Sequence, residues 1–243
     1  MTIPNPFVGN ARSGGGDFEL PEPGSHLATI VALVDCGTHD EVYDNYGVQV
    51  VKPTRKAFLV FELDGSAKQD GTPFVLSKEY SVSTHERGGL RKLAETLRGK
   101  RYDDSLMNPD GSRGEKIDYT KLVGVSCIVN VAVNKSKTSG KEYAAVKEVT
   151  AKLKGQSPTS KPTYLDAKGK GLIWFVGMDL SQLPAWLPWV SGKRPTDYIG
   201  SSYESRGLTP AAEQPAAKGG TQQHGAAATP AMAAAAMDDE AAF

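Results

Sequence analysis

The chain has 243 residues, of which 39% are hydrophobic, and its 28 basic side chains are balanced by 28 acidic ones. This length is enough for one hydrophobic core of about 150–200 residues with appendages. No apolar run approaches the ~20 residues of a membrane-spanning helix, and no secretory signal pattern opens the chain. We therefore expect a cytoplasmic protein that does not contact membranes.

The net charge is unevenly distributed along the chain. Residues 207–243 contain one lysine and four acidic side chains, a net of 1 − 4 = −3, so residues 1–206 carry +3. A basic body with an acidic end is typical of a protein that binds an anionic ligand and, separately, a partner. An ordinary protein with a solvating tail is the alternative, and charge alone does not decide between the two.

The first third of the chain contains three strand-like runs. Residues 1–23 hold four prolines and a run of three glycines, which predicts a flexible N-terminal arm. Residues 24–37 are apolar on both alternating faces, as in a strand that is covered on both sides. Residues 38–54 are polar and aromatic and predict a long loop. Residues 55–63 and 74–83 alternate again and predict the second and third strands.

A short amphipathic helix is predicted after the third strand. Leucines recur at positions i, i+3 and i+7 starting from Leu90, which places them on one helical face. The pattern Ser83-x-x-Glu86 resembles a capping box, and Gly99 stands where a helix C′ residue is expected. Two glycines directly before Leu90 weaken the first turn, so we expect the helix to begin near Gly89.

The most regular pattern of the chain lies between residues 123 and 149. Every odd position from Val123 to Val133 is apolar, which predicts a strand with one buried face. Residues 134–141 are basic and turn-forming, and residues 143–149 are strand-like again, so we expect a long hairpin. Lys147 interrupts the apolar face of the second arm, which a β-bulge would accommodate. The tip carries Lys135, Lys137 and Lys141.

The order of these elements predicts a fold class. Five strands with a helix between the third and the fourth is the order of an OB-fold, a partly open Greek-key barrel. We therefore predict a mainly β fold with an OB-type barrel over residues 24–154. Residues 155–206 are expected to form a small extension on the barrel, with an added strand at 172–176 and the tryptophans of 183–189 packed against it. Residues 207–243 turn to Ala, Gly, Gln, Pro and Thr, which predicts a disordered linker with an acidic tail.

The predicted strands carry cations interleaved with aromatic rings, the combination that binds single-stranded nucleic acid. In OB-folds the second and third strands, with the first and fourth inter-strand loops, form the binding face. We therefore expect a nucleic-acid site that consists of Arg55, Lys56, Phe58, Lys78, Tyr80, Tyr43, Tyr46, Lys135, Lys137, Lys141 and Tyr143.

Some of these side chains also have an ordinary structural explanation. Phe58 and Tyr80 can be core residues, and Lys78 can lie on a solvated face. A second basic set surrounds the predicted helix, and we expect it to contribute less to nucleic-acid binding than the first set. Its members are Arg87, Arg91, Lys92 and Arg98.

The chain ends in three consecutive acids close to a terminal aromatic residue. A flexible linker of the length of residues 207–237 spans roughly 30 Å r.m.s., so the tip can reach a partner while the body stays bound elsewhere. The terminal ring can fill an apolar pocket, and the acids can pair with a basic rim. An acidic end without a partner is the alternative. The expected partner-binding residues are Asp238, Asp239, Glu240 and Phe243.

Two parts of the chain resemble a known family. The tail Asp238-Asp-Glu-Ala-Ala-Phe243 is similar to the acidic, aromatic-ended tails of bacterial and T7-type phage single-stranded-DNA-binding proteins, although it has three acids rather than a longer acidic run. Residues 24–151 resemble a phage-encoded group of single-strand binders. This second resemblance lies in the runs Gly24-Ser-His-Leu27, Phe58-Leu-Val-Phe-Glu-Leu63, Ser77-Lys-Glu-Tyr80, Leu90-Arg-Lys-Leu93 with Arg98-Gly99, and Leu122-Val-Gly124.

The resemblance implies a fold and a function. It implies an OB-fold that binds single-stranded DNA without sequence preference in DNA replication, recombination and repair, in the host cytoplasm if the gene belongs to a phage. It also implies that the tail recruits replication proteins (a polymerase, a helicase or primase, or a nuclease) and competes with DNA for the basic groove. The oligomeric state, the site size and the preference between RNA and DNA stay open.

Signals for catalysis are weak. The chain has neither a Gly-x4-Gly-Lys-Ser/Thr phosphate loop nor a Gly-x-Ser-x-Gly nucleophile elbow. We expect no enzymatic activity and no cofactor. The competing functions are a structural or assembly protein of a virion and, with less support, a metal-dependent nuclease.

Two weak metal-binding alternatives accompany the nuclease hypothesis. The two cysteines lie in apolar runs, and we expect them to be buried and reduced rather than metal-bound, because no paired cysteine spacing is present. The residues of a zinc alternative would be Cys36, His39, His26, His85 and Cys127, and those of a magnesium alternative would be Asp103, Asp104 and Asp110.

Overall fold

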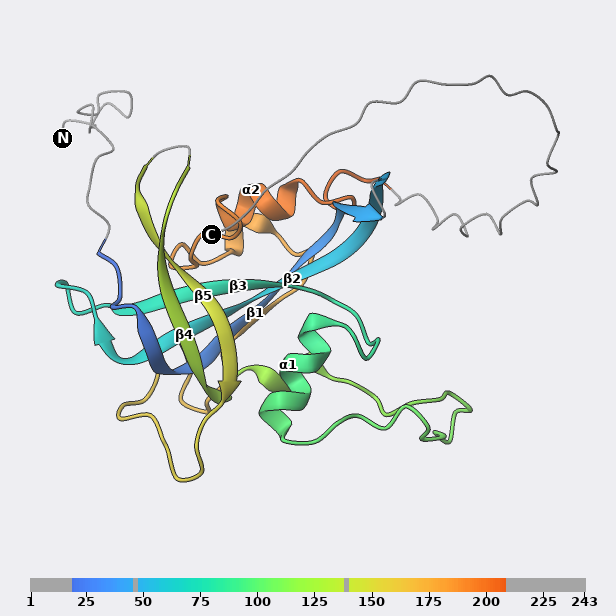
Figure 1. Ribbon diagram of the computed structural model, residues 1–243, viewed down its shortest axis with the longest axis horizontal. Helices are drawn as coiled ribbons and strands as arrows, with labels where there is room; N and C mark the ends of the chain where they lie inside the picture. Colours follow the sequence, from blue (N-terminus) through green and yellow to red (C-terminus); the bar gives the residue numbers. More distant parts are fainter. Residues whose placement is uncertain (1–18, 46–47, 138–139, 209–243) are drawn as a thin grey trace, which may run out of the picture. The chain divides into compact units, whose positions relative to one another are not determined.

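The computed structural model describes residues 19–45, 48–137 and 140–208 (Figure 1). All of them belong to the first of the two units into which the chain divides, Met1–Ala211 and Ala212–Phe243. The expected mainly β fold is confirmed in this part of the chain. Its elements are β1 (Gly24–Asn45), β2 (Val48–Ala67), β3 (Pro73–Ser81), α1 (Gly89–Arg98), η1 (Tyr119–Leu122), β4 (Ser126–Lys135), β5 (Glu142–Ala151), β6 (Leu172–Trp174), η2 (Leu180–Gln182) and α2 (Pro195–Gly200).

The described strands form one sheet with the order β3-β2-β1-β4-β5, in which all neighbours are antiparallel. β1 is the central strand. One of its edges pairs with β2, and the other edge pairs first with β4 over residues 24–29 and then with β6, which runs parallel to residues 32–34. Within the described residues no backbone ladder joins β3 to β5, so hydrogen bonds between strands do not close the sheet into a barrel.

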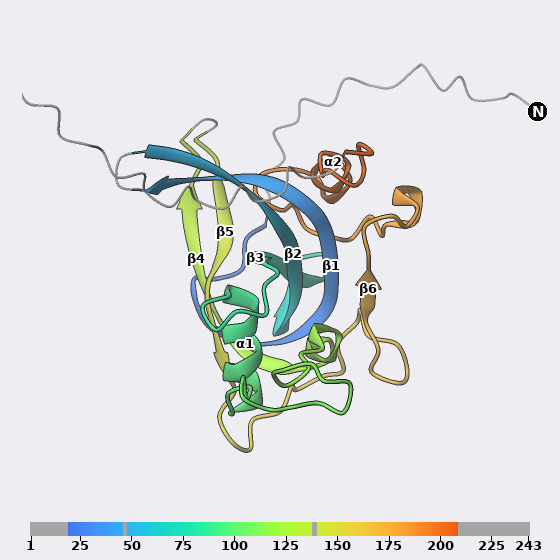
Figure 2. The same ribbon diagram turned by 90° about the vertical axis from the view of Figure 1, so that its right-hand side faces the viewer.

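β1 bends strongly along its length, as Figure 2 shows. The β1–β2 register shifts between Ile30 and Ala32 and again between Asp35 and Gly37. Each shift inserts a residue into one strand, which bends the strand and increases its twist. The curved sheet therefore wraps partly around the core on its inner face.

The sheet has a hydrophobic core on each face, as the doubly apolar run at residues 24–37 predicts. Ile30 and Leu33 lie in the inner core, whereas Val31 and Val34 lie in the outer core. α1 covers the inner core with its leucines and Leu90 is almost fully buried, a burial worth about 1.5–3 kcal/mol for a leucine. Figure 2 shows α1 and α2 on different sides of the sheet.

Both ends of α1 lie where the sequence predicts them. The helix begins at Gly89 and ends at Arg98, and the next residue, Gly99, has a φ of 71°, the left-handed conformation expected of a helix C′ glycine. The predicted capping box is wrong, because no side chain caps the helix. Ser83 instead accepts a hydrogen bond from the backbone N–H of His85.

The predicted loop at residues 38–54 is also wrong. β1 continues to Asn45 and β2 begins at Val48, so this segment is the outer half of a long hairpin. Val42 and Val51 pair with each other and are both exposed. None of the described residues of this segment is buried, so no buried face imposes alternation, and for this reason its sequence resembled a loop.

The β4–β5 hairpin contains the predicted bulge. Asn130 pairs with Glu148 and Val131 pairs with Val146, so Lys147 is left without a partner in the register. The bulge moves Val149 and Val146 to the same side in spite of their odd spacing. Val146 is buried in the inner core, and Val149 packs against that core.

Residues 155–208 cover the outer face of the sheet. Glu62 on β2 is buried there and accepts hydrogen bonds from the backbone N–H groups of Thr163 and Tyr164, at 2.7 and 3.1 Å. β6 is the predicted added strand, although it is shorter than expected. Trp174 is buried in the outer core, and Trp186 stacks on Tyr164 with 4.1 Å between ring centroids.

Candidate nucleic-acid interface

The outer face of β2 and β3 is where the expected binding site would lie, and residues 155–208 occupy it. Phe58 is 0% exposed and packs in the outer core, which also contains Trp174 and Ile199. Ser77 on β3 donates a hydrogen bond to the backbone oxygen of Trp189 at 2.8 Å. This placement removes Phe58 from the candidate interface, because no base can reach its ring in this structure.

The two cations expected on β2 are held by carboxylates. The side chain of Lys56 is only 10% exposed, and its ammonium lies 2.9 Å from Glu41 and 3.6 Å from Glu79. Arg55 donates two hydrogen bonds to Asp35, at 3.1 and 2.5 Å. These contacts lower the pKa of the Glu41 carboxyl and raise the pKa of the Arg55 guanidinium, so each contact favours the charged form of that group.

Lys78 and Tyr80 on β3 point to the inner side of the sheet. Tyr80 packs against the inner core, and burial raises the pKa of its hydroxyl. The ammonium of Lys78 lies 2.5 Å from the backbone oxygen of Lys147 and 5.9 Å from the centre of the Tyr80 ring. Burial lowers the pKa of Lys78. Lys78 therefore links β3 to the bulge in β5 rather than facing solvent.

The β4–β5 hairpin is the part of the expected site that is open to solvent. Figure 1 shows the two strands as a twisted ribbon that extends past the edge of the other strands. Lys135, Lys137 and Lys141 are exposed near its tip, and Tyr143 is 48% exposed on the second arm. The register pairs Tyr143 with Asn134, which places the ring next to the basic tip. These four residues are called the basic hairpin tip below.

The other expected site residues are not placed by the structure. The backbone of Tyr43 lies in β1, paired with Val50, but the placement of its side chain lies outside what the structure describes. Tyr46 also lies outside the described residues. The same holds for the expected partner-binding tail, which consists of Asp238, Asp239, Glu240 and Phe243.

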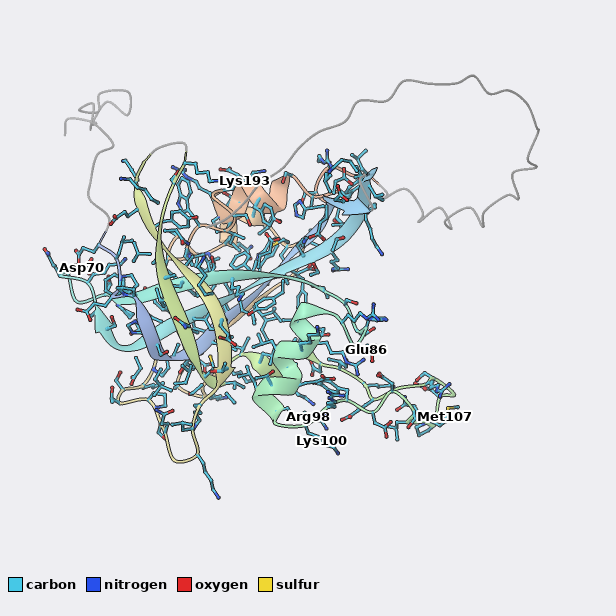
Figure 3. The ribbon with its side chains drawn as sticks, in the orientation of Figure 1. Asp70, Glu86, Arg98, Lys100, Met107 and Lys193 are labelled. Carbon is cyan, nitrogen blue, oxygen red and sulfur yellow. The ribbon has the colours of Figure 1, made fainter. Side chains whose placement is uncertain are left out.

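The second basic set around α1 is divided between structural and exposed residues. Arg91 is buried and contacts Glu95 at 2.9 Å and Asp104 at 2.8 Å, so it fastens the loop after the helix. Arg98 pairs with Glu115 at 2.5 Å, and Figure 3 shows Arg98 and Lys100 at the C-terminal end of α1. The remaining members, Arg87 and Lys92, are exposed.

One exposed aromatic residue was not expected at the surface. The sequence predicts that Trp189 packs against the barrel, but its side chain is 63% exposed. The following run Ser191-Gly-Lys-Arg194 combines a turn with two exposed cations, which is the signal that could have identified this position.

Comparison of the sequence with protein families and with curated proteins adds no functional evidence to these observations. No protein-family model matches the chain, and no curated protein matches it significantly in sequence.

The positions of the two cysteines do not support the zinc alternative. Cys36 is buried in the outer core and Cys127 in the inner core, on different faces of the sheet. Burial raises the pKa of both thiols, that of Cys127 to about 12, so both are protonated at neutral pH. Across the described part of the chain, no three His, Cys, Asp or Glu side chains are grouped so that they could hold a metal ion.

No helix within residues 19–45, 48–137 and 140–208 is long and apolar enough to cross a bilayer.

Proposed function

We propose that this protein binds single-stranded DNA without sequence preference and that the basic hairpin tip makes the main contacts with the DNA backbone. The observation that carries the proposal is the contrast between the two groups of cations. Lys56 and Arg55 are held by acidic side chains, whereas Lys135 and Lys137 are exposed and form no ion pair within the described residues. Binding a phosphate at the tip therefore breaks no ion pair of these two lysines.

The proposed mechanism combines charge with stacking. Lysines along the tip neutralise successive phosphates and release the counterions condensed on the DNA, which makes the affinity depend on salt. The exposed ring of Tyr143 offers a face for one base, and such a stack contributes about 1–3 kcal/mol without distinguishing the bases. Both interactions tolerate any sequence, in keeping with general single-strand binding.

An OB-type barrel is part of the same proposal. The element order, the central place of β1 and the position of α1 beneath the inner core support it. The contact from Lys78 to Lys147 also supports it, because it joins the two outer strands of the sheet, β3 and β5, where a barrel would close. In this arrangement the β4–β5 hairpin corresponds to one of the two loops that bind ligands in OB-folds.

The proposal includes a role in DNA replication, recombination and repair, in which the acidic tail recruits replication proteins. Its support is the sequence: three acids and a terminal phenylalanine follow a long linker that is poor in charged residues. An acidic tip can pair with a basic rim on a partner, and a terminal ring can enter an apolar pocket there.

Removing the two exposed lysines tests the role of the tip. We predict that the double variant Lys135→Ala/Lys137→Ala binds labelled oligo-dT more weakly in fluorescence-anisotropy titrations. The slope of log affinity against log salt should also become shallower by about 1.4, since each lost phosphate contact changes it by ~0.7 for a single strand.

The matched control removes the same charge from a different place. Lys168 and Lys170 are exposed in the loop before β6, outside the β4–β5 hairpin. Lys168→Ala/Lys170→Ala should retain the affinity and the salt slope of the unaltered protein. If both double variants lose the same affinity, the loss comes from the change in net charge, and this result would contradict a binding role for the tip.

A further inference from the structure

The segment that covers the outer face contains a tight turn with defined geometry. Val190 and Lys193 exchange both backbone hydrogen bonds, at 2.9 Å each, around the two residues Ser191 and Gly192. Both residues have positive φ, 49° and 76°, as in the type I′ turns that close two-residue hairpins. Among the described residues, Ser191 alone has positive φ without being a glycine, so its surroundings determine this backbone closely.

The turn is fastened to β3 on one side and to the outer core on the other. Ser77 donates a hydrogen bond to the backbone oxygen of Trp189, and Ser191 donates one to Glu79, each at 2.8 Å. Leu187 and Val190, on either side of Trp189, are buried. The backbone that carries Trp189 is therefore held on both sides.

The indole of Trp189 remains exposed on this fixed backbone. The other two tryptophans are accommodated by the protein, Trp174 in the outer core and Trp186 against Tyr164. A large aromatic face that is exposed on a rigid turn loses little conformational entropy when a ligand stacks on it. This is the arrangement expected of a preformed stacking surface.

Cations accompany the exposed ring. Lys193 and Arg194 are both exposed, and Figure 3 shows Lys193 next to α2. Trp189 directly precedes the bridged pair Val190–Lys193 and Arg194 directly follows it, so the ring and both cations belong to the same short turn. Glu79, the acid nearest to the turn along β3, already contacts Ser191 and Lys56. The ligand that fits an aromatic face with two cations is a base with its phosphate.

We propose that Trp189 forms a nucleobase-stacking subsite in which Lys193 and Arg194 contact the adjoining phosphates of a single strand. The subsite rests on the proposed function and adds to it a second contact region outside the β4–β5 hairpin. β3 connects the two regions: Ser77 holds Trp189, and the next residue, Lys78, contacts Lys147 of β5. One strand of DNA can thus run from the basic hairpin tip across the edge of β3 to Trp189.

The test combines anisotropy with intrinsic fluorescence on the full chain. Trp189→Ala should weaken oligo-dT binding by about 5- to 150-fold, the range for loss of one base stack, and Trp189→Phe should restore most of the affinity. Oligo-dT should quench tryptophan emission of the unaltered protein, and this quenching should disappear in both variants. Because the Trp189 side chain is exposed, its replacement should not disturb the fold. Restored affinity in Trp189→Phe would show that loss of affinity in Trp189→Ala comes from the lost ring and not from misfolding.

The control is another exposed ring of the same segment. Phe175 is 50% exposed but is followed by Val176 and Gly177 rather than by cations, so Phe175→Ala should bind as the unaltered protein does. If Trp189→Ala binds as tightly as Phe175→Ala and the unaltered protein shows no quenching, the subsite is wrong while the proposed function stands. If the unaltered protein does not bind oligo-dT at all, the proposed function fails and the subsite fails with it.

Discussion

Lys56 joins three strands through its side chain alone. It extends from β2, and its ammonium reaches Glu41 on β1 and Glu79 on β3, while Ser81 lies 3.2 Å away. A cation that is 10% exposed needs such partners, because a buried charge without a counter-charge costs several kcal/mol. The charge of Lys56 is therefore held by the protein and is not available to a ligand.

This network predicts a specific pH dependence. The hydrogen bond from Lys56 holds the pKa of Glu41 below its ordinary value of 4.5. A carboxyl with a lowered folded-state pKa stabilises the protein above its unfolded pKa, and this contribution is lost as the pH falls through the folded pKa. We therefore predict that Glu41→Gln lowers the free energy of unfolding at about pH 7 and that this difference shrinks toward about pH 3, as measured by urea denaturation.

A double-mutant cycle isolates the pair. In a Lys56→Met background, which keeps the apolar stem and removes the charge, Glu41→Gln should have an effect that does not vary with pH in this range. A Glu41→Gln effect in the unaltered background that stays constant between neutral and acid pH would contradict the predicted stabilisation by Lys56.

The backbones of β6 and β1 lie close together at the start of β6. Gly171 directly precedes β6, and a Cβ at this position would meet the carbonyl oxygen of Val31 and the side chains of Val123 and Leu165. Val31 is the residue that the first bulge of β1 leaves out of the register. The bulge of β1 and Gly171 therefore lie at the same contact, next to the point where β6 pairs with β1.

A single methyl group at this junction should disturb the cover. We predict that Gly171→Ala lowers the free energy of unfolding by about 1–3 kcal/mol, the usual cost of overpacking, because a backbone oxygen cannot rotate away as a side chain can. Gly200→Ala is the matched control, since a Cβ there meets no atom within 4 Å. Urea denaturation of both variants measures the difference, and equal stabilities would show that the close approach is not required.

The strands of the sheet were predictable because each has at least one buried face. The alternating runs at 55–63 and 123–133 correspond to β2 and β4, and the interruption at Lys147 corresponds to a real bulge. The ribbon at 38–54 was missed because none of its described residues is buried, and a pattern of period two then has no cause.

The candidate site was less predictable than the strands for a related reason. Alternation assigns Lys56 and Phe58 to the same face of β2, which is correct, but it does not say what covers that face. The cover comes from residues 155–208, whose short elements and prolines carry no regular period. Only the basic hairpin tip could be placed at the surface from sequence, because a run of lysines and turn residues does not enter a core.

In the whole molecule, residues 155–208 cover the outer face of β2 and β3, so the proposed DNA path lies elsewhere. The outer face of β2 and β3 holds ion pairs and a core, whereas the β4–β5 hairpin and the turn at Trp189 each combine exposed cations with an exposed ring. A strand that uses both regions would bind along the margin of the sheet rather than across its covered face. The acidic tail would complete the proposed molecule as a tether for replication proteins.

The most direct test of single-strand binding is to titrate the full chain with labelled oligo-dT, and with a duplex of equal length, over a range of salt concentrations. We predict tight binding of the single strand, a steep loss of affinity with salt and little affinity for the duplex. A chain that lacks residues 238–243 should bind the single strand at least as tightly. No binding of oligo-dT with or without the tail would contradict the proposed function and would favour the assembly protein.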